Sequence, residues 1–178
     1  MKKWLLLIIC VFLITGCKVE YNVTINDDAK VLESVNMTGE DAFFDTYYKT
    51  LRINVIKSLL AANGNEDLLK DNHYDYKVVE DKKYPYVLAN KEYNDIDSYA
   101  NSSIFFEQFF DKVEVTKKDN IITFKASEFK PNSPQDLSRF DVGDATINIT
   151  SKYKVVKNNA DSISEKDNIY TWNITNNT

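Results

Sequence analysis

The segment "KVEYNVTINDDAKVLESVNMT", residues 18–38, has a side-chain pattern that predicts two paired strands. In its first half polar and apolar residues alternate, which places the apolar ones on one face of a strand. Asp27 and Asp28 then favour a turn, after which the chain returns as a second strand. We therefore expect a half-buried hairpin. The side chains expected on its buried face are Val19, Tyr21, Val23, Ile25, Val31, Val35 and Met37.

A helical pattern follows the hairpin. Its apolar residues recur at intervals of three and four, which places them on one side of a helix. Glu40 and Asp41 suit the start of this helix, and Gly64 suits its end. A short second helix is expected around residues 65–72. The apolar residues of the long helix are Phe44, Tyr47, Tyr48, Leu51, Val55, Leu59 and Ala62.

The rest of the chain reads mainly as strands, with one more short helix at "SSIFFEQFF", residues 102–110. Pro85 is expected to place its strand at an edge of the sheet or to delay the start of that strand. The sequence therefore predicts an α+β fold with a largely antiparallel sheet, covered on one face by one long and one or two short helices. The expected strand segments are residues 74–80, 84–93, 112–126, 145–156 and 169–175.

The first seventeen residues have the pattern of a secretory signal. Lys2 and Lys3 precede an eleven-residue apolar run, which ends at Ile14. As a helix, the stretch up to Cys17 is about 21 Å long, shorter than the hydrocarbon core of a bilayer. Ile14-Thr15-Gly16-Cys17 resembles the lipobox of bacterial lipoprotein signal peptides. A plain signal peptide that happens to end in cysteine is the alternative.

The lipobox resemblance implies a signal peptide over residues 1–16 and a single extracytoplasmic domain over residues 17–178. It also implies that Cys17 receives a diacylglyceryl group, and that its new amino group is available for acylation, for example with palmitate. Two or more acyl chains hold a protein stably on a membrane, whereas a single chain does so only marginally. We therefore expect a lipid-anchored protein on the extracytoplasmic face of the cell membrane.

Three stretches also resemble the LppM-type lipoprotein domain, a family of bacterial envelope lipoproteins. They are "GCKVEYNVTINDDAKVLESV" (16–35), "FFDKVEVTKKDNIITFKA" (109–126) and "INITSKYKVVKNNADSISEKDNIYTWNI" (147–174). The resemblance implies an α+β domain outside the cytoplasmic membrane and, for at least one branch of the family, a lipid-binding cavity. It supplies no catalytic residues.

Charge and composition exclude several functions. The chain has a formal net charge of −5, and loss of Lys2 and Lys3 with the signal peptide makes it more acidic. Nucleic-acid binding needs clustered basic residues, so it is not expected. The two cysteines, Cys10 and Cys17, both lie at the start of the chain, so neither a disulfide nor a thiolate metal site is expected in the folded body.

Signals for catalysis are weak. His73 is the single histidine and lies in a polar stretch, where a solvated loop position is expected. Neighbouring carboxylates such as Asp95 and Asp97 suit helix starts and turns as well as they suit a cleft. We expect no enzyme activity, no catalytic residues, no metal and no cofactor.

Aromatic residues on helical stripes are the remaining candidates for a site. They belong to the hydrophobic core, or they line a cavity between helices and sheet that accepts a lipid or another hydrophobic envelope molecule. The alternative function is an interaction or scaffolding lipoprotein that binds an envelope protein and no small ligand. The candidate lining residues are Tyr47, Tyr48, Phe105, Phe106, Phe109 and Phe110.

Overall fold

The predicted hairpin forms the centre of the structure. Its strands are β1 (Cys17–Ile25) and β2 (Val31–Gly39), which pair antiparallel in the register Tyr21 to Val35. Ala29 closes the turn between them with a φ of 65°. This computed structural model describes residues 17–39, 49–61, 65–80, 84–109, 113–118, 121–126 and 142–175.

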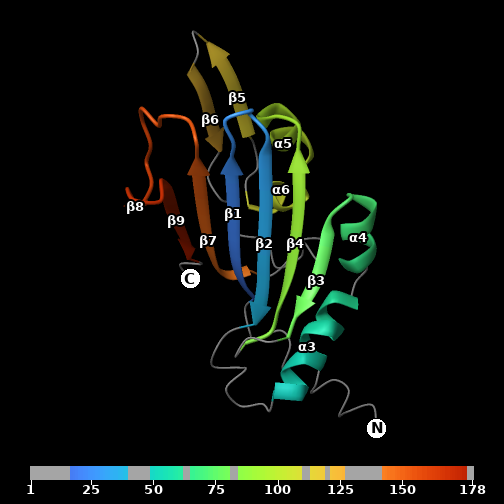
Figure 1. The fold of residues 1–178 in the computed structure, drawn as a ribbon. Helices are drawn as coiled ribbons and strands as arrows, with labels where there is room; N and C mark the ends of the chain where they lie inside the picture. Colours follow the sequence, from blue (N-terminus) through green and yellow to red (C-terminus); the bar gives the residue numbers. More distant parts are fainter. Residues whose placement is uncertain are drawn as a thin grey trace.

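Five further strands extend the hairpin into a seven-stranded sheet of order β3-β4-β2-β1-β7-β9-β8, shown face-on in Figure 1. All neighbouring pairs are antiparallel except β1 and β7, which are parallel. The expectation of a largely antiparallel sheet is confirmed. The added strands are β3 (Asp75–Val79), β4 (Tyr86–Tyr93), β7 (Val142–Ser151), β8 (Ser162–Ser164) and β9 (Ile169–Thr175).

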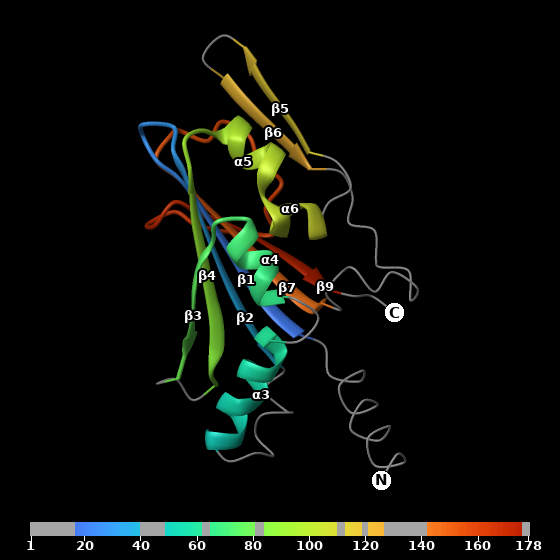
Figure 2. The same cartoon turned by 90° about the vertical axis from the view of Figure 1, so that its right-hand side faces the viewer.

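The described helices lie on one face of the sheet, as Figure 2 shows edge-on, so the α+β prediction is confirmed. There is one long helix, and the described part of the chain contains three short ones rather than one or two. Within that part no helix covers the opposite face, which we call the open face (Figures 1 and 2). The helices are α3 (Lys49–Ala61), α4 (Asn65–Asp71), α5 (Ile96–Ser102) and α6 (Ile104–Phe109).

The side of α3 that packs on the sheet differs from the predicted one. Leu51 belongs to the predicted stripe but is 44% exposed, whereas Ile56 is 1% exposed and packs with Val87. Apolar residues lie on more than one side of this helix, so the spacing alone did not identify the buried side. Of the other predicted stripe residues, Val55 is half buried. Phe44, Tyr47, Tyr48 and Ala62 lie outside the described residues, as does the side chain of Leu59.

Strands β5 (Val113–Lys118) and β6 (Ile121–Ala126) form a separate antiparallel hairpin, as predicted. Figure 1 shows that it projects from the end of the domain opposite the start of β1. Val115 and Phe124 pack against the main core, and Lys117 pairs with Asp97 of α5 at 2.6 Å. These contacts fix the hairpin to the helical layer.

Pro85 delays a strand, which was one of its two predicted effects. It directly precedes β4, and β4 lies between β3 and β2 rather than at an edge. The carbonyl of Pro85 accepts a hydrogen bond from Thr38 Oγ1 at 3.0 Å.

Candidate functional site

Cys17 is the first residue of β1, in the middle of the sheet. Its backbone lies opposite Gly39 of β2 and Val142 of β7, while its side chain lies outside the described residues. The folded sheet therefore begins at the predicted attachment residue with no linker. An anchor at this position would hold the lower end of the sheet in Figure 1 close to the membrane.

Phe105 and Phe106 of α6 point from the helical layer toward the sheet and are 4% and 2% exposed. Phe105 meets the ring of Tyr74 edge-on at 5.2 Å, and Phe106 meets the ring of Phe124 at 5.2 Å. These two residues are part of the hydrophobic core. The rest of the predicted lining lies outside the described residues: Tyr47, Tyr48, Phe110 and the side chain of Phe109.

A fully buried carboxylate, Glu33, lies between the sheet and the helices. It is 0% exposed and belongs to the core-facing side of β2, between Val31 and Val35. Burial of a charged side chain is costly unless hydrogen bonds compensate it. Its surroundings therefore define the most distinctive polar site in the described part of the chain.

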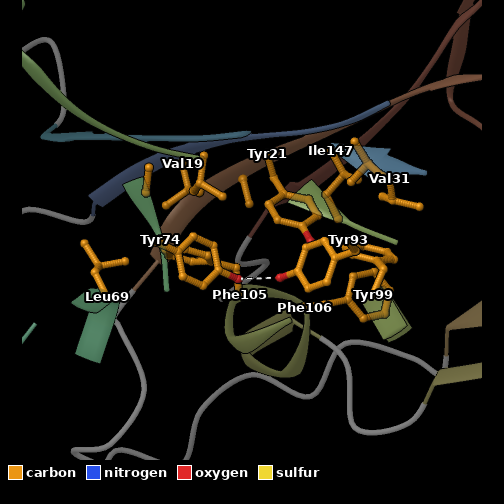
Figure 3. Packing of buried hydrophobic residues seen from close by; sticks show 14 of the residues in the cluster. Val19, Tyr21, Val31, Leu69, Tyr74, Tyr93, Tyr99, Phe105, Phe106 and Ile147 are labelled. Carbon is orange, nitrogen blue, oxygen red and sulfur yellow. Dashed lines mark hydrogen bonds between the residues drawn. The ribbon is translucent and has the colours of Figure 1, made fainter. Parts of the chain in front are cut away.

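Four hydroxyl groups donate hydrogen bonds to Glu33. Tyr21 and Ser103 donate to Oε1, each at 2.5 Å, and Tyr74 and Tyr93 donate to Oε2, each at 2.6 Å. A carboxylate has about four lone-pair sites, so its capacity as an acceptor is filled. Figure 3 shows the hydroxyls of Tyr74 and Tyr93, which are 2.8 Å apart, facing each other between the sheet and α6. We call Glu33 and these four residues the hydroxyl cluster.

Tyr99 extends the hydroxyl cluster into helix α5. Its hydroxyl lies 2.6 Å from that of Tyr21, and since Tyr21 uses its single proton on Glu33, Tyr99 is the donor. Ser103 connects the cluster to α6, because its Oγ also accepts from the backbone N–H of Phe106 at 3.0 Å. The cluster thus links β1, β2, β4 and the segment before β3 to the two helices that lie over them.

The tyrosines of this region are held in their neutral, proton-donating form. Burial raises the pKa of Tyr21, Tyr74, Tyr93 and Tyr99 well above the usual value of 10, and the nearby Glu33 raises it further. Ionising any of them would place a second negative charge beside the carboxylate in a buried site. These groups therefore act as hydrogen-bond donors at all ordinary pH values.

Lys91 supplies a positive charge at the border of the cluster. It lies directly opposite Glu33 in the register of β2 and β4, so both side chains project from the same face. Its Nζ lies 5.0 Å from the ring centre of Tyr74 and 4.7 Å from that of Tyr93. Lys91 therefore contacts the faces of the two rings whose hydroxyls bind Glu33.

The hydroxyl cluster was not identified from the sequence, although a signal was present. Val31 and Val35 were placed on the buried face, and a period of two puts Glu33 on that face as well. The tyrosines that surround it come from four separate segments, so no local spacing could reveal them. What the cluster does in this structure is join sheet and helices through saturated polar contacts.

The other residues considered for catalysis or metal binding lie in a turn and at the start of a helix. His73 is exposed and lies in the turn after α4 with a φ of 60°, as expected for a loop residue. Asp95 caps the start of α5 by accepting from Ser98 N at 2.7 Å. Among the described residues no three His, Cys, Asp or Glu side chains lie close enough together to hold a metal ion.

The chain is thus an α+β protein whose described helices cover one face of the sheet and enclose a buried carboxylate bound by hydroxyls. No family model matches the chain, and no curated protein matches it. Among solved structures, the chain is similar to the folded domain of LppM from Mycobacterium tuberculosis, determined by NMR. The two are 12% identical with a TM-score of 0.47, over 90% of this chain and 82% of that one. The resemblance to the LppM-type family therefore stays a prediction.

Proposed function

We propose that this protein is a lipid-anchored lipoprotein on the extracytoplasmic face of the cell membrane, attached through Cys17. We further propose that its domain binds a lipid or another hydrophobic envelope molecule and catalyses no reaction. The lipobox pattern that ends at Cys17, together with the start of the folded sheet at the same residue, supports the anchor. No helix in the described part of the chain is long and apolar enough to span a membrane.

The observation that carries the binding proposal is the aromatic layer between α6 and the sheet. Rings from α5, α6, β6 and the segment before β3 pack edge to face or stacked in this layer, with centres 5.2–6.1 Å apart. Phe105 and Phe106 point into it, and in the sequence Phe109 and Phe110 follow at the i+4 spacing that predicts the same side of a helix. A hydrocarbon chain that enters between α6 and the sheet would meet these rings and the apolar face of the sheet once the helix moves away from the core.

Native mass spectrometry of residues 18–178, purified from a bacterial host, tests the binding proposal. We expect a co-purifying lipid, and we expect Phe109→Ser to reduce the lipid-bound fraction. Ile163→Ser is the matched control, because Ile163 is 49% exposed on β8, at the far edge of the sheet. A bare protein mass for the unmodified sequence would contradict lipid binding.

A separate experiment tests the anchor. Cys17→Ser is expected to abolish incorporation of radiolabelled palmitate and to release the protein from membranes or leave its precursor uncut. A processed Cys17→Ser protein that stays fully in the membrane fraction would contradict attachment through Cys17.

A second function, that of an interaction lipoprotein without a small ligand, is favoured by one specific observation. Ile121 and Ile122 of β6 are 51% and 38% exposed near the tip of the β5–β6 hairpin. This tip lies at the end of the domain opposite Cys17, so an anchored protein would present it away from the membrane (Figures 1 and 2). Ile121→Ser with Ile122→Ser would then abolish crosslinking to an envelope protein while leaving lipid binding unchanged.

A further inference from the structure

The open face of the sheet carries a row of amide and hydroxyl side chains in register across its strands. Each neighbouring pair of residues in the row is paired in the strand register, including the parallel pair Asn22 and Asn148. The row continues to Asp75 at one edge and Ser162 at the other. Figure 1 views this face directly. The row, which we call the amide row, consists of Asn90, Ser34, Asn22, Asn148 and Thr171.

The amide row is unfavourable for the strands that carry it. Asparagine is depleted in strands, and here it occupies interior positions of three strands, β1, β4 and β7, none of which is an edge strand. A local preference that is violated without a gain in packing commonly marks a functional position. The in-register placement of these residues therefore marks the row as a candidate binding surface.

Hydrogen bonds within the row fix the orientation of its amides. Asn148 Nδ2 donates to Asn22 Oδ1 at 3.0 Å, and Thr171 Oγ1 donates to Asn148 Oδ1 at 2.8 Å. With these acceptors used, the Nδ2 group of Asn22 remains a donor that hydrogen-bonds to no residue of the described part. The side chains of Ser34 and Asn90 likewise form no hydrogen bond with described residues. The row therefore offers oriented donors and acceptors at its centre.

The charges and apolar residues around the row restrict what can bind there. The five residues of the row are uncharged, and Asp75 lies at one end of it. Beside the row Glu92 pairs with Lys30 at 3.2 Å, and Glu20 and Lys77 carry opposite charges, so this surface has no excess of positive charge to attract a polyanion. Leu32 and Leu88 lie on opposite sides of the row and are separated by it, so they form no continuous apolar patch. A neutral ligand rich in hydroxyl or amide groups matches this surface.

We propose that the amide row binds a neutral glycan strand, such as a chain of N-acetylated or unmodified hexoses. Sugar hydroxyls and N-acetyl groups both donate and accept hydrogen bonds, which matches the amides and hydroxyls of the row. At a strand spacing of about 4.8 Å, five neighbouring strands give a row about 19 Å long, which is enough for several sugar units. This proposal is independent of the lipid anchor and of lipid binding.

Retention of the full-length protein, solubilised in detergent, on insoluble polysaccharides tests this proposal. The probes are chitin and cellulose as neutral glycans, cross-linked polygalacturonate as an anionic one, and phosphatidylglycerol vesicles as a membrane. The variant is Asn22→Thr with Asn148→Thr, because threonine favours strands and the substitution replaces each amide with a shorter hydroxyl, which removes the oriented amide groups. Asn101→Ala removes an amide from the exposed side of α5 and is the matched control.

We expect retention on at least one neutral glycan and an about tenfold lower retained fraction for the double variant, with unchanged circular dichroism. The Asn101→Ala control should be retained like the unmodified protein. Lack of retention on both neutral glycans would overturn the proposal. So would equal retention of the double variant, equal loss in the control, or a row-dependent binding found only with polygalacturonate or with the vesicles.

Discussion

The two faces of the seven-stranded sheet use polar residues in opposite ways. On the helix-covered face, Glu33 is 0% exposed and all its acceptor sites are filled by hydroxyls of the protein itself. On the open face, Asn22 and its neighbours retain groups with no partner in the described part of the chain. The difference indicates that the first set of polar groups holds the fold together and that the second is available for binding.

The contrast is sharpest between two consecutive residues of β2. Glu33 and Ser34 point to opposite faces because the side chains of a strand alternate. Removing the first should therefore destabilise the domain, while changes in the row that contains the second should affect binding more than stability.

Alkaline pH is expected to have the largest effect, and most of it comes from the buried tyrosines of the covered face. The pKa values of Tyr21, Tyr74, Tyr93 and Tyr99 are raised in the folded state, so the folded protein binds more protons than the unfolded chain above pH 10. Their contribution to stability is complete below pH 10 and is lost as the pH rises further. Each tyrosine lowers the free energy of unfolding by up to about 1.4 kcal/mol per pH unit. The four tyrosines together lower it by about 5 kcal/mol between pH 9 and pH 11.

Urea unfolding followed by circular dichroism at pH 9, 10 and 11 measures this loss. Tyr99→Phe removes one of the four titrating groups. It should therefore reduce the slope of the free energy of unfolding against pH by about a quarter. A free energy of unfolding that is unchanged up to pH 11 would contradict the assigned burial of these hydroxyls.

Glu33→Ala is expected to reduce the free energy of unfolding by about 4 kcal/mol, because four buried hydroxyls lose their acceptor at once. Glu33→Gln keeps the shape and one acceptor oxygen, so a smaller loss of about 2 kcal/mol is expected. Glu20 lies on the open face of the same hairpin, and Glu20→Ala should change the free energy of unfolding by less than about 0.5 kcal/mol. Urea midpoints compare the three variants, and similar losses for Glu33→Ala and Glu20→Ala would remove the distinction between the faces.

The strands could be predicted because their sequence patterns are local. Alternation placed Val19, Tyr21 and Val23 on the buried face, and their exposed fractions are 5%, 0% and 2%. The turn at Asp27 and Asp28 was predicted for the same reason, since it depends on neighbouring residues. These features require no knowledge of distant parts of the chain.

The site could not be predicted, because it depends on contacts between distant segments. The parallel pairing of β1 with β7 joins residues more than a hundred positions apart, and the amide row exists only through that pairing. The hydroxyl cluster similarly joins Tyr21 to Tyr99, 78 positions later. The one local clue was the position of Glu33 between two buried valines. This position predicts that the acid is buried, but it does not predict which residues contact it.

Tyr93→Phe is expected to have an intermediate effect. It removes one of the four donors to Glu33 and leaves the ring in place, so a loss of about 1–2 kcal/mol is expected. Tyr86→Phe is the matched control, since Tyr86 lies on the same strand but is seven positions away, with its side chain on the open face. Urea unfolding compares the two variants. If Tyr86→Phe lowered the free energy of unfolding as much as Tyr93→Phe, the hydrogen bond from Tyr93 to Glu33 would contribute nothing beyond what an ordinary tyrosine hydroxyl contributes.

Asn148→Thr is expected to have the smallest effect on stability, and in the opposite direction. The substitution removes the amide bonded to Asn22 and Thr171 but introduces a residue with a higher strand propensity. The free energy of unfolding should therefore stay the same or rise by up to about 0.5 kcal/mol. A loss of 2 kcal/mol or more would place the amide row among the groups that hold the fold together, and the open face would then resemble the covered one. An unchanged or higher stability combined with weaker glycan retention would separate the two faces, because no stabilising role would then account for asparagine at this position.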